Sequence, residues 1–515
     1  MKQILNMLRA GAGVDLRSLA LLRIGYALLL LGDLADRAQD LAAHYSDLGV
    51  LPRSALLELF SESYYWICLH AISGTWQFQA FLFLLQAGFA VVLLVGYKTR
   101  PMTFLCWLLL ISLHCRNPMV LTAGDIIFRV IFFWALFLPW GARWSVDAAL
   151  QPGLRKLPDR YVALPGLALL CQVAFIYWFA VLHKTGKEWM SDGSAVYYAL
   201  QIDQLVTPAG QYLGTFYALT VALTLAVYWF QILAPCLLFS PVANGPLRTV
   251  AVFGFVAMHL GFAMCLGLGI FPWIAICTVL GVLPSWFWER LGARWSRHRL
   301  EELPARLANR LGLAEESEKP IPVQPGPAGN LLVAALLVYV LAWNIDTITP
   351  RQVMPVGLHW IGYLVRIDQE WDMFSPHPLV DDGWYVIEAR LADGRQVDLY
   401  RDGAELCWEK PARVASTFRN GRWRKYMMNL WWAVLEPHRL HYSRYLCRTW
   451  NASHPPDEQL TSFRIYFMLE KTRLNYEPTE PVKRLLWTHW CLDRPPERRP
   501  TRGYRQAGGV SPRCR

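Results

Sequence analysis

Long apolar runs recur along the chain between residues 17 and 348. Most of them approach the roughly 20 residues that a helix needs to cross the hydrocarbon core of a bilayer. They predict about nine membrane-spanning helices, near residues 17–35, 78–97, 101–115, 125–141, 161–183, 215–240, 247–268, 269–288 and 329–348. We therefore expect a polytopic α-helical membrane domain over residues 1–348.

The pattern changes after the last apolar run. Residues 384–391 and 396–400 flank the turn sequence Ala-Asp-Gly-Arg and predict a β-hairpin. Alternating apolar positions at residues 463–469 predict a third strand, and residues 423–435 predict a helix rich in Trp and Met. We expect a soluble α+β domain over residues 349–495 on the membrane surface, followed by a disordered basic tail at 496–515.

Composition supports the membrane assignment. The 515 residues are 54% hydrophobic and include 24 Trp, 22 Tyr and 24 Phe, and such aromatic residues suit the two interfaces of a bilayer. The lipid bilayer is thus the expected partner. The formal charge is +11, but no basic domain of a nucleic-acid-binding type is recognisable, so we expect no nucleic-acid partner.

The positive charges report the expected topology. Under the nine-span count the loops on one side are basic, whereas the loops at 36–58 and 188–212 are near neutral or acidic. By the positive-inside rule the N-terminus is cytoplasmic, and the odd number of spans places the C-terminal domain on the exoplasmic side. Residues 289–328 join the last two spans as a basic cytoplasmic linker. The basic residues are Arg9, Arg17, Lys98, Arg100, those of 143–160, Arg248, Arg290, Arg294, Arg297, Arg299, Arg306 and Arg310.

The eleven cysteines divide by location. Seven lie in or beside the apolar runs, where cysteine behaves as a small buried hydrophobe. Cys407, Cys447, Cys491 and Cys514 lie in the C-terminal region, and a disulfide among the first three is compatible with an exoplasmic location. The sequence leaves the pairing open. The chain has no Cys-x-x-Cys motif, so we predict no metal site.

Ionisable residues inside or beside apolar spans are costly and mark candidate sites. Lys184 follows an apolar run, residues 161–182, in which only Gln172 is strongly polar. Loss of water there favours the neutral amine, which can act as a base. Alternatively, the lysine is a helix-end residue that reaches toward the interface. His259 lies in the middle of another run and is either a site residue or a packed core histidine.

Two further residues are candidates for shaping a cavity. Asp125 and Arg129 lie four positions apart at the start of a span, so they share a helix face and can form an ion pair. Such a pair can also serve packing alone. We expect Arg23 and Asp33, in the first span, to pair with residues of other helices.

Several loop motifs occur in a definite order. They are HYSDLGVLPR at 44–53, RNPMVLTAGD at 116–125, FLPWGARWSVD at 137–147, QEWDMFSP at 369–376 and DGWY at 382–385. Over roughly residues 15–390 this set resembles the horizontally transferred transmembrane (HTTM) domain family, the bacterial relatives of vitamin K-dependent γ-glutamyl carboxylase. The resemblance implies an integral protein of the bacterial inner membrane.

The resemblance also implies a chemistry. The segment Ala-Val-Leu-His-Lys ending at Lys184 is similar to that of the carboxylase lysine that deprotonates reduced vitamin K, and Met258-His259 followed by residues 269–272 is similar to a histidine segment of the same enzyme. By this analogy Lys184 and His259 are catalytic. We expect His183, Asp125 and Arg129 to support the wall of the same cavity, although the resemblance itself gives these three residues no role. A reduced vitamin K-type quinone is the implied cofactor, with O2 and CO2 as co-substrates.

The substrate remains open. The carboxylase has a lysine where this chain has His183, and its large luminal region is replaced here by a domain without similarity. The acceptor is therefore an unknown peptide or small molecule. Two other classes of function remain: a membrane maturation or assembly factor that binds through the C-terminal domain, and a transporter, for which the sequence lacks a convincing internal repeat.

Overall fold

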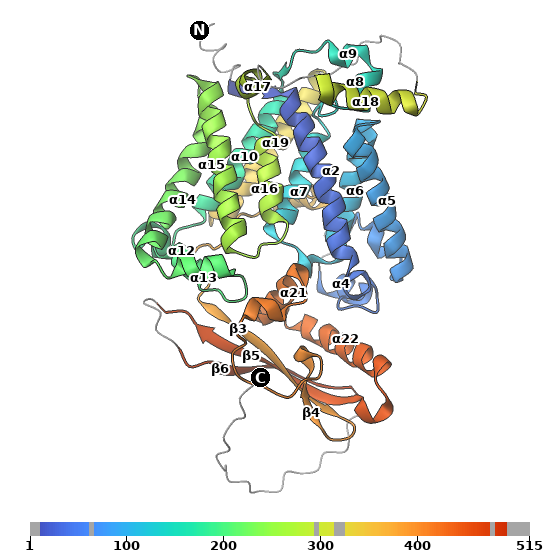
Figure 1. Ribbon diagram of the computed structural model, residues 1–515, viewed down its shortest axis with the longest axis vertical. Helices are drawn as coiled ribbons and strands as arrows, with labels where there is room; N and C mark the ends of the chain where they lie inside the picture. The colour runs from blue at the N-terminus through green and yellow to red at the C-terminus, as the bar shows by residue number, and fades with distance from the viewer. Residues whose placement is uncertain (1–10, 61–65, 293–297, 314–324, 474–478, 492–515) are drawn as a thin grey trace.

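The computed structural model describes residues 11–60, 66–292, 298–313, 325–473 and 479–491. In Figure 1 a bundle of helices stands above a small sheet, and helix α2 begins on the side away from that sheet. We call these parts the helical domain, formed by α2 to α19, and the sheet domain, formed by α21, α22 and β3 to β6. The predicted tail at 496–515 lies outside the described residues.

Among the described residues, six helices are long and apolar enough to cross a membrane. They are α2 (Leu16–Ala38), α5 (Trp76–Val95), α10 (Leu164–Leu182), α14 (Tyr217–Leu238), α15 (Asn244–Cys265) and α19 (Pro327–Ile348). A seventh candidate is the pair α16 (Phe271–Leu280) and α17 (Ser285–Gly292), whose axes meet at 83°. The structure thus supports a helical protein with six or seven candidate spans.

The other two predicted spans form helices that are not long and apolar enough to count as candidate membrane spans. Helix α6 (Thr99–Arg116) carries polar residues at both ends, and α7 (Ala123–Ala135) has only 13 residues. At 1.5 Å per residue α7 is about 20 Å long, less than the thickness of the hydrocarbon core. Pro139 and Gly141 follow soon after its end and are incompatible with a longer helix. Nearly all of α7 is buried among the longer helices.

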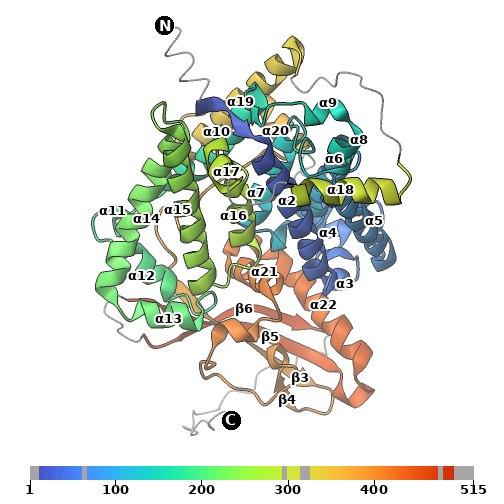
Figure 2. The same ribbon diagram turned by 45° about the horizontal axis from the view of Figure 1, so that its top comes forward.

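Short helices cover the two ends of the bundle. At the end away from the sheet, α8 (Val146–Leu150) and α9 (Pro152–Arg155) lie near α18 (His298–Arg310), as Figure 2 shows from a second angle. Ala308 of α18 packs against Val146 and Leu150 of α8, so part of the predicted linker is a docked helix. Toward the sheet lie α3 (Leu41–Tyr45), α4 (Arg53–Leu59), α11 (Lys187–Met190), α12 (Ala195–Leu200) and α13 (Pro208–Gly214).

The sheet domain confirms the predicted hairpin and third strand. Its four strands are antiparallel in the order β4 (Gln396–Asp398), β3 (Asp381–Leu391), β5 (Leu460–Lys471), β6 (Val482–Trp490). Gly394 in the hairpin turn has φ of +90°, a value that glycine adopts without steric cost. Helix α21 (Gly421–Trp431) matches the predicted helix closely, whereas α22 (Pro437–Ser453) and β6 were not predicted.

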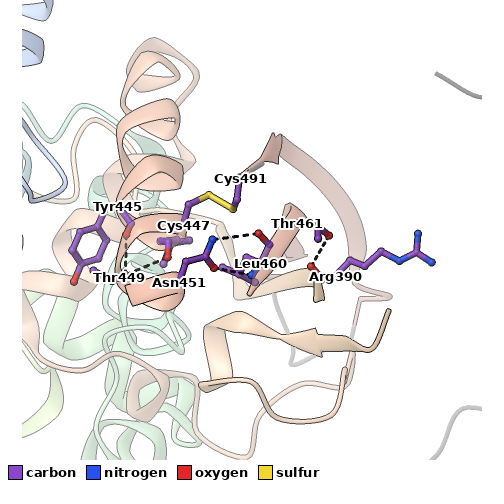
Figure 3. The surroundings of a disulfide bond; sticks show 9 residues. Arg390, Tyr445, Cys447, Thr449, Asn451, Leu460, Thr461 and Cys491 are labelled. Atoms are coloured by element: carbon purple, nitrogen blue, oxygen red, sulfur yellow. Dashed lines mark hydrogen bonds between the residues drawn. A yellow bond between two sulfur atoms is a disulfide. The ribbon is translucent and has the colours of Figure 1, made fainter. Parts of the chain in front are cut away.

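Helices α21 and α22 lie between the sheet and the helical domain (Figure 1). The phenol of Tyr385 on β3 donates to the carbonyl oxygen of Met427 on α21 at 2.8 Å. A disulfide joins Cys447 of α22 to Cys491, just after β6 (Figure 3). Two of the three cysteines singled out from the sequence are therefore bonded to each other, and the bond fastens the edge strand to α22.

The chain between α19 and β3 turns back toward the helical domain. Helix α20 (His359–Val365) packs along the last turns of α19, where Gly362 N–H donates to the Tyr339 hydroxyl at 2.8 Å. Farther on, Ile367 and Trp371 are fully buried in the core of the helical domain. We call residues 356–373 the returning segment. The sheet domain proper therefore begins later than the predicted boundary at residue 349.

Candidate functional site: two neighbouring cavities

An apolar cavity of about 460 Å3 lies between α10, α12, α14 and α15. Tyr177, Ala180 and Lys184 line it from α10 and its C-terminal end, because residues at these spacings share one helix face. Phe230 of α14 and His259 of α15 line the other walls. The structure thus brings the two predicted catalytic residues, Lys184 and His259, to one cavity.

The side chain of Lys184 folds back onto the last turn of α10. Its Nζ donates to the carbonyl oxygen of Ala180 at 2.8 Å, and only 5% of the residue is exposed. A cation is favoured near the C-terminal carbonyl groups of a helix. The ring of Trp189 also lies 4.9 Å from Nζ, in the position of a cation–π contact.

No salt bridge to Lys184 occurs among the described residues. Burial therefore dominates and lowers the pKa of its ammonium group from 10.5 to about 7. An amine with such a pKa is partly neutral near neutral pH and can accept a proton from a bound molecule. This finding favours the base over the alternative of a solvated helix-end lysine.

His259 is 3% exposed and surrounded by aromatic rings. Its Nε2 lies 3.0 Å from the hydroxyl of Tyr177, whose ring stacks on Phe255 at 3.9 Å. The other ring nitrogen, Nδ1, has no hydrogen-bond partner among the described residues. A buried nitrogen without a partner is costly, so His259 retains the capacity to bind a polar group in the cavity.

His183 faces a different neighbour from Lys184. Its Nε2 lies 3.1 Å from the hydroxyl of Thr347 on α19. Thr347 lines a second, larger cavity of about 840 Å3 between the returning segment, the start of α7 and α21. The two adjacent residues at the end of α10 thus contact the surroundings of two different cavities.

Many of the side chains that line the second cavity are charged or otherwise polar. Arg129 of α7 pairs there with Asp368 of the returning segment, with Nη2 2.9 Å from Oδ2. Lys425 reaches the same cavity from α21. Non-helical chain within a bundle of apolar helices is tolerated where protein buries it or where it lines a polar cavity, and the returning segment meets both conditions.

One short stretch of chain separates the two cavities. Met373 and Phe374 line both of them. The carbonyl oxygen of Phe374 accepts a hydrogen bond from the indole of Trp189 at 3.0 Å, and Gly186 N–H donates to the carbonyl oxygen of Pro376 at 3.1 Å. The loop that follows Lys184 is therefore fastened to the wall of the polar cavity.

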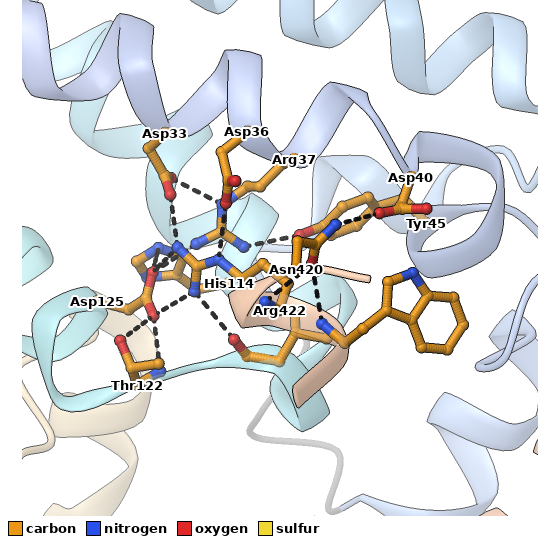
Figure 4. Close-up of polar contacts among 12 residues, drawn as sticks. Asp33, Asp36, Arg37, Asp40, Tyr45, His114, Thr122, Asp125, Asn420 and Arg422 are labelled. Carbon is orange, nitrogen blue, oxygen red and sulfur yellow. Dashed lines mark hydrogen bonds and ion pairs between the residues drawn. The ribbon is translucent and has the colours of Figure 1, made fainter. Parts of the chain in front are cut away.

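Asp125 lies outside both cavities, in a buried ion cluster. Its carboxylate contacts Arg37 of α2 and Arg422 of α21, with 2.7 Å between Arg422 Nη1 and Asp125 Oδ2. Arg422 also reaches Asp33, which pairs in turn with Arg37 (Figure 4). The two residues expected to pair with each other, Asp125 and Arg129, thus each form a salt bridge to the C-terminal part of the chain.

The same cluster contains a triad with metal-binding residue types. Ligand atoms of Asp33, His114 and Asp125 all lie within 4.8 Å of one another. However, Arg37 and Arg422 already neutralise the two carboxylates, and a divalent cation would lie beside two guanidinium groups. We assign the cluster to the docking of the sheet domain. Arg23, in α2, donates to the carbonyl oxygen of Trp144.

No protein-family model, curated protein or solved structure matches this chain. The functional argument therefore depends on the site itself. Sequence reasoning missed Tyr177, Trp189 and the returning segment. For Tyr177 a signal existed, since it precedes Lys184 by seven residues and so shares its helix face.

Proposed function

We propose that this protein is a membrane enzyme that binds a reduced lipophilic quinone in the apolar cavity and uses Lys184 as the base. The observation that carries the proposal is a deeply buried amine that faces an apolar cavity without a carboxylate partner. Buried ionisable groups of this kind, placed in a cleft with a shifted pKa, are typical of functional sites.

The residues of the cavity fit a naphthoquinone of the vitamin K type. The volume of about 460 Å3 lies within the usual range for small-molecule sites. Its walls are mainly aromatic and aliphatic, and the few polar groups include Lys184 Nζ and the unpartnered Nδ1 of His259. We assign to Lys184 and His259 the binding of the two ring oxygens, and to Phe230 and Phe262 contact with the rings.

The role of each residue follows from its surroundings. Lys184 accepts the proton of a phenolic hydroxyl, because burial keeps a large fraction of its amine neutral. Tyr177 fixes the ring of His259 through the contact at Nε2. The apolar walls exclude water, which would otherwise quench a strong base.

When bound, the reduced quinone would supply all four electrons that reduce O2, two through oxidation of the hydroquinone to the quinone level and two through formation of the epoxide, so that one oxygen atom enters the epoxide and the other leaves as water. In the proposed reaction this oxidation is coupled to removal of a proton from a carbon next to a carbonyl group in an acceptor, to which CO2 adds. The acceptor is a peptide or small molecule of unknown identity.

We further propose a placement in the bacterial inner membrane with the sheet domain outside the cytoplasm. The basic residues of α9, α17 and α18 lie on helices at the end opposite the sheet (Figure 1), as the positive-inside rule requires of the cytoplasmic end. The Cys447–Cys491 disulfide supports an oxidising compartment for the sheet domain.

The experiment is a quinone-oxidation assay that needs no acceptor. Purified protein in nanodiscs receives a reduced naphthoquinone and air, and epoxide is measured for the wild type, Lys184→Ala and the matched control Lys187→Ala. Lys187 is an ammonium three residues away with 71% of its side chain exposed. We expect epoxide from the wild type and the control and none from Lys184→Ala. Absence of epoxide from all three across several quinones would favour the maturation or assembly factor instead.

A further inference from the structure

The polar cavity has its own chemistry, independent of the apolar one. Most of its charges are neutralised within the wall. Asp368 pairs with both Arg129 and Arg366, and Asp346 accepts hydrogen bonds from the N–H groups of Val353 and Met354. These groups hold the returning segment in place and are not available to a ligand.

Three charged side chains of the wall remain. Glu370 and Asp372 lie two positions apart on the returning segment, and both are exposed within the described structure. Neither carboxylate forms a hydrogen bond or salt bridge to another described side chain. Lys425, the third, comes from α21 and also forms no salt bridge among the described residues, although it is partly buried.

All three groups line the same cavity, and their charges act on one another. Burial lowers the pKa of Lys425, and the field of Asp372 opposes that change. Although the side chain of Glu370 is exposed at the mouth of the cavity, partial loss of water raises its pKa, and Asp372 adds to the rise. Asp372 also acts on His183, at the end of α10. The cavity therefore presents two carboxylates and one ammonium group, and His183, which precedes Lys184, contacts Thr347 of its wall.

We propose that this polar cavity is a second ligand site, which takes a small zwitterionic molecule of the amino-acid type. Glu370 and Asp372 bind its ammonium group, and Lys425 binds its carboxylate. The large volume and the polar wall suit such a molecule, whereas the apolar cavity would exclude it. A ligand that carries only ammonium groups would leave Lys425 without an opposite charge, and a ligand that carries only carboxylates would leave Glu370 and Asp372 without one.

The position of this site gives it a role. Among the described residues, Met373 and Phe374 alone line both cavities, so a ligand here lies next to the site of the proposed base. The statement that the zwitterion is the acceptor of the reaction rests on the proposed function. The statement that the polar cavity binds a zwitterion does not. The two statements can therefore fail separately.

The test uses three probes of equal chain length without quinone: 5-aminopentanoate, 1,5-diaminopentane and glutarate. Binding to the full chain in nanodiscs is measured by calorimetry for the wild type, the double variant Glu370→Gln/Asp372→Asn, and Lys425→Met. Glu405→Gln, an exposed glutamate outside the cavity, is the matched control. The thermal midpoint of each variant confirms that it is folded.

We expect the wild type and the control to bind 5-aminopentanoate at least tenfold more tightly than either other probe. The double variant should lose tenfold or more for both amine-containing probes, and Lys425→Met should lose a similar factor for the two carboxylate-containing probes, 5-aminopentanoate and glutarate. Tightest binding of glutarate or of the diamine, equal loss in the control, or no binding of any probe would overturn the proposal. Epoxide formation without zwitterion binding would sustain the proposed function and reject this site.

Discussion

Arg422 and Asp125 form a buried salt bridge although they stand 297 positions apart in the chain. The guanidinium comes from the sheet domain, and the carboxylate comes from a short helix in the middle of the helical domain. Only 8% of the Arg422 side chain and 1% of the Asp125 side chain are exposed to solvent. The sheet domain is therefore anchored inside the helical domain and not merely laid against it.

Replacing Arg422 by Ala should destabilise the protein strongly. The change leaves Asp33 and Asp125 buried with one guanidinium between them, and loss of one partner from a buried ion pair costs about 3–5 kcal/mol. Thermal unfolding in detergent measures the effect. Arg419→Ala is the control, because Arg419 pairs with Asp40 but has 69% of its side chain exposed, and such a surface pair contributes about 0–1 kcal/mol. Equal effects of the two variants would contradict a docking role for the cluster.

Replacing Lys184 by Met should raise stability while it abolishes quinone oxidation. A buried polar group costs roughly 1–3 kcal/mol relative to an apolar side chain of similar size, and the amine has only a carbonyl and an aromatic ring as partners. A residue kept for packing would show the opposite sign. Thermal unfolding and the epoxide assay on the same preparation separate the two roles.

The pH dependence of stability provides a second measurement of Lys184. Its pKa in the folded chain is about 7, against 10.5 ordinarily, so between these values the unfolded chain binds more protons than the folded one. The free energy of unfolding should therefore rise with pH across this window. In Lys184→Met the rise should shrink, and an unchanged profile would show that the amine is not desolvated.

Asp382 should give a pH dependence of the opposite sign. It accepts hydrogen bonds from Asp203 N–H and the Gln204 amide, yet burial raises its pKa from 3.8 to about 6. The stability that this group contributes is present below pH 3.8 and is lost as the pH rises through 6, on the order of 3 kcal/mol. Asp382→Asn should flatten this part of the profile, whereas Asp457→Asn, an exposed aspartate, should leave it unchanged.

The disulfide should matter to the sheet domain alone. Cys447 and Cys491 are 44 positions apart, and closing a loop of that length stabilises a fold by about 4 kcal/mol in the chain-entropy model. Cys447→Ser should therefore lower the thermal midpoint and expose β6 to hydrogen exchange. Exchange in α10 should stay as in the wild type, and faster exchange there would show that the two domains unfold as one.

The sequence predicts the elements of this fold better than their roles. Apolar runs predicted a helix for each expected span, because a run of that length has few other stable forms. Helix α22 escaped prediction, since its mixture of Arg, His and Tyr shows no clear apolar stripe. Helix α7 is short because the chain turns after Ala135. The sequence remains apolar through this turn, so its hydrophobicity did not show where the helix ends.

The candidate site, like the fold, could be predicted from the sequence only in part. Lys184 and His259 could be singled out because each interrupts or ends an apolar run. The partners of Asp125 could not, because Arg422 comes from another domain and no local pattern relates the two residues. The polar cavity was equally hidden, since residues 356–373 read as the start of a soluble domain and only tertiary packing returns them to the helical core.

A short stretch of chain joins the returning segment to β3, the strand that pairs with both β4 and β5. Between Phe374 and the first residue of β3, Asp381, there is only a short stretch of chain, too short to absorb a large displacement. A macromolecule that pulled on the sheet would therefore pull directly on the partition between the cavities. A force applied to the sheet domain would thus reach the wall shared by the two cavities along one covalent connection.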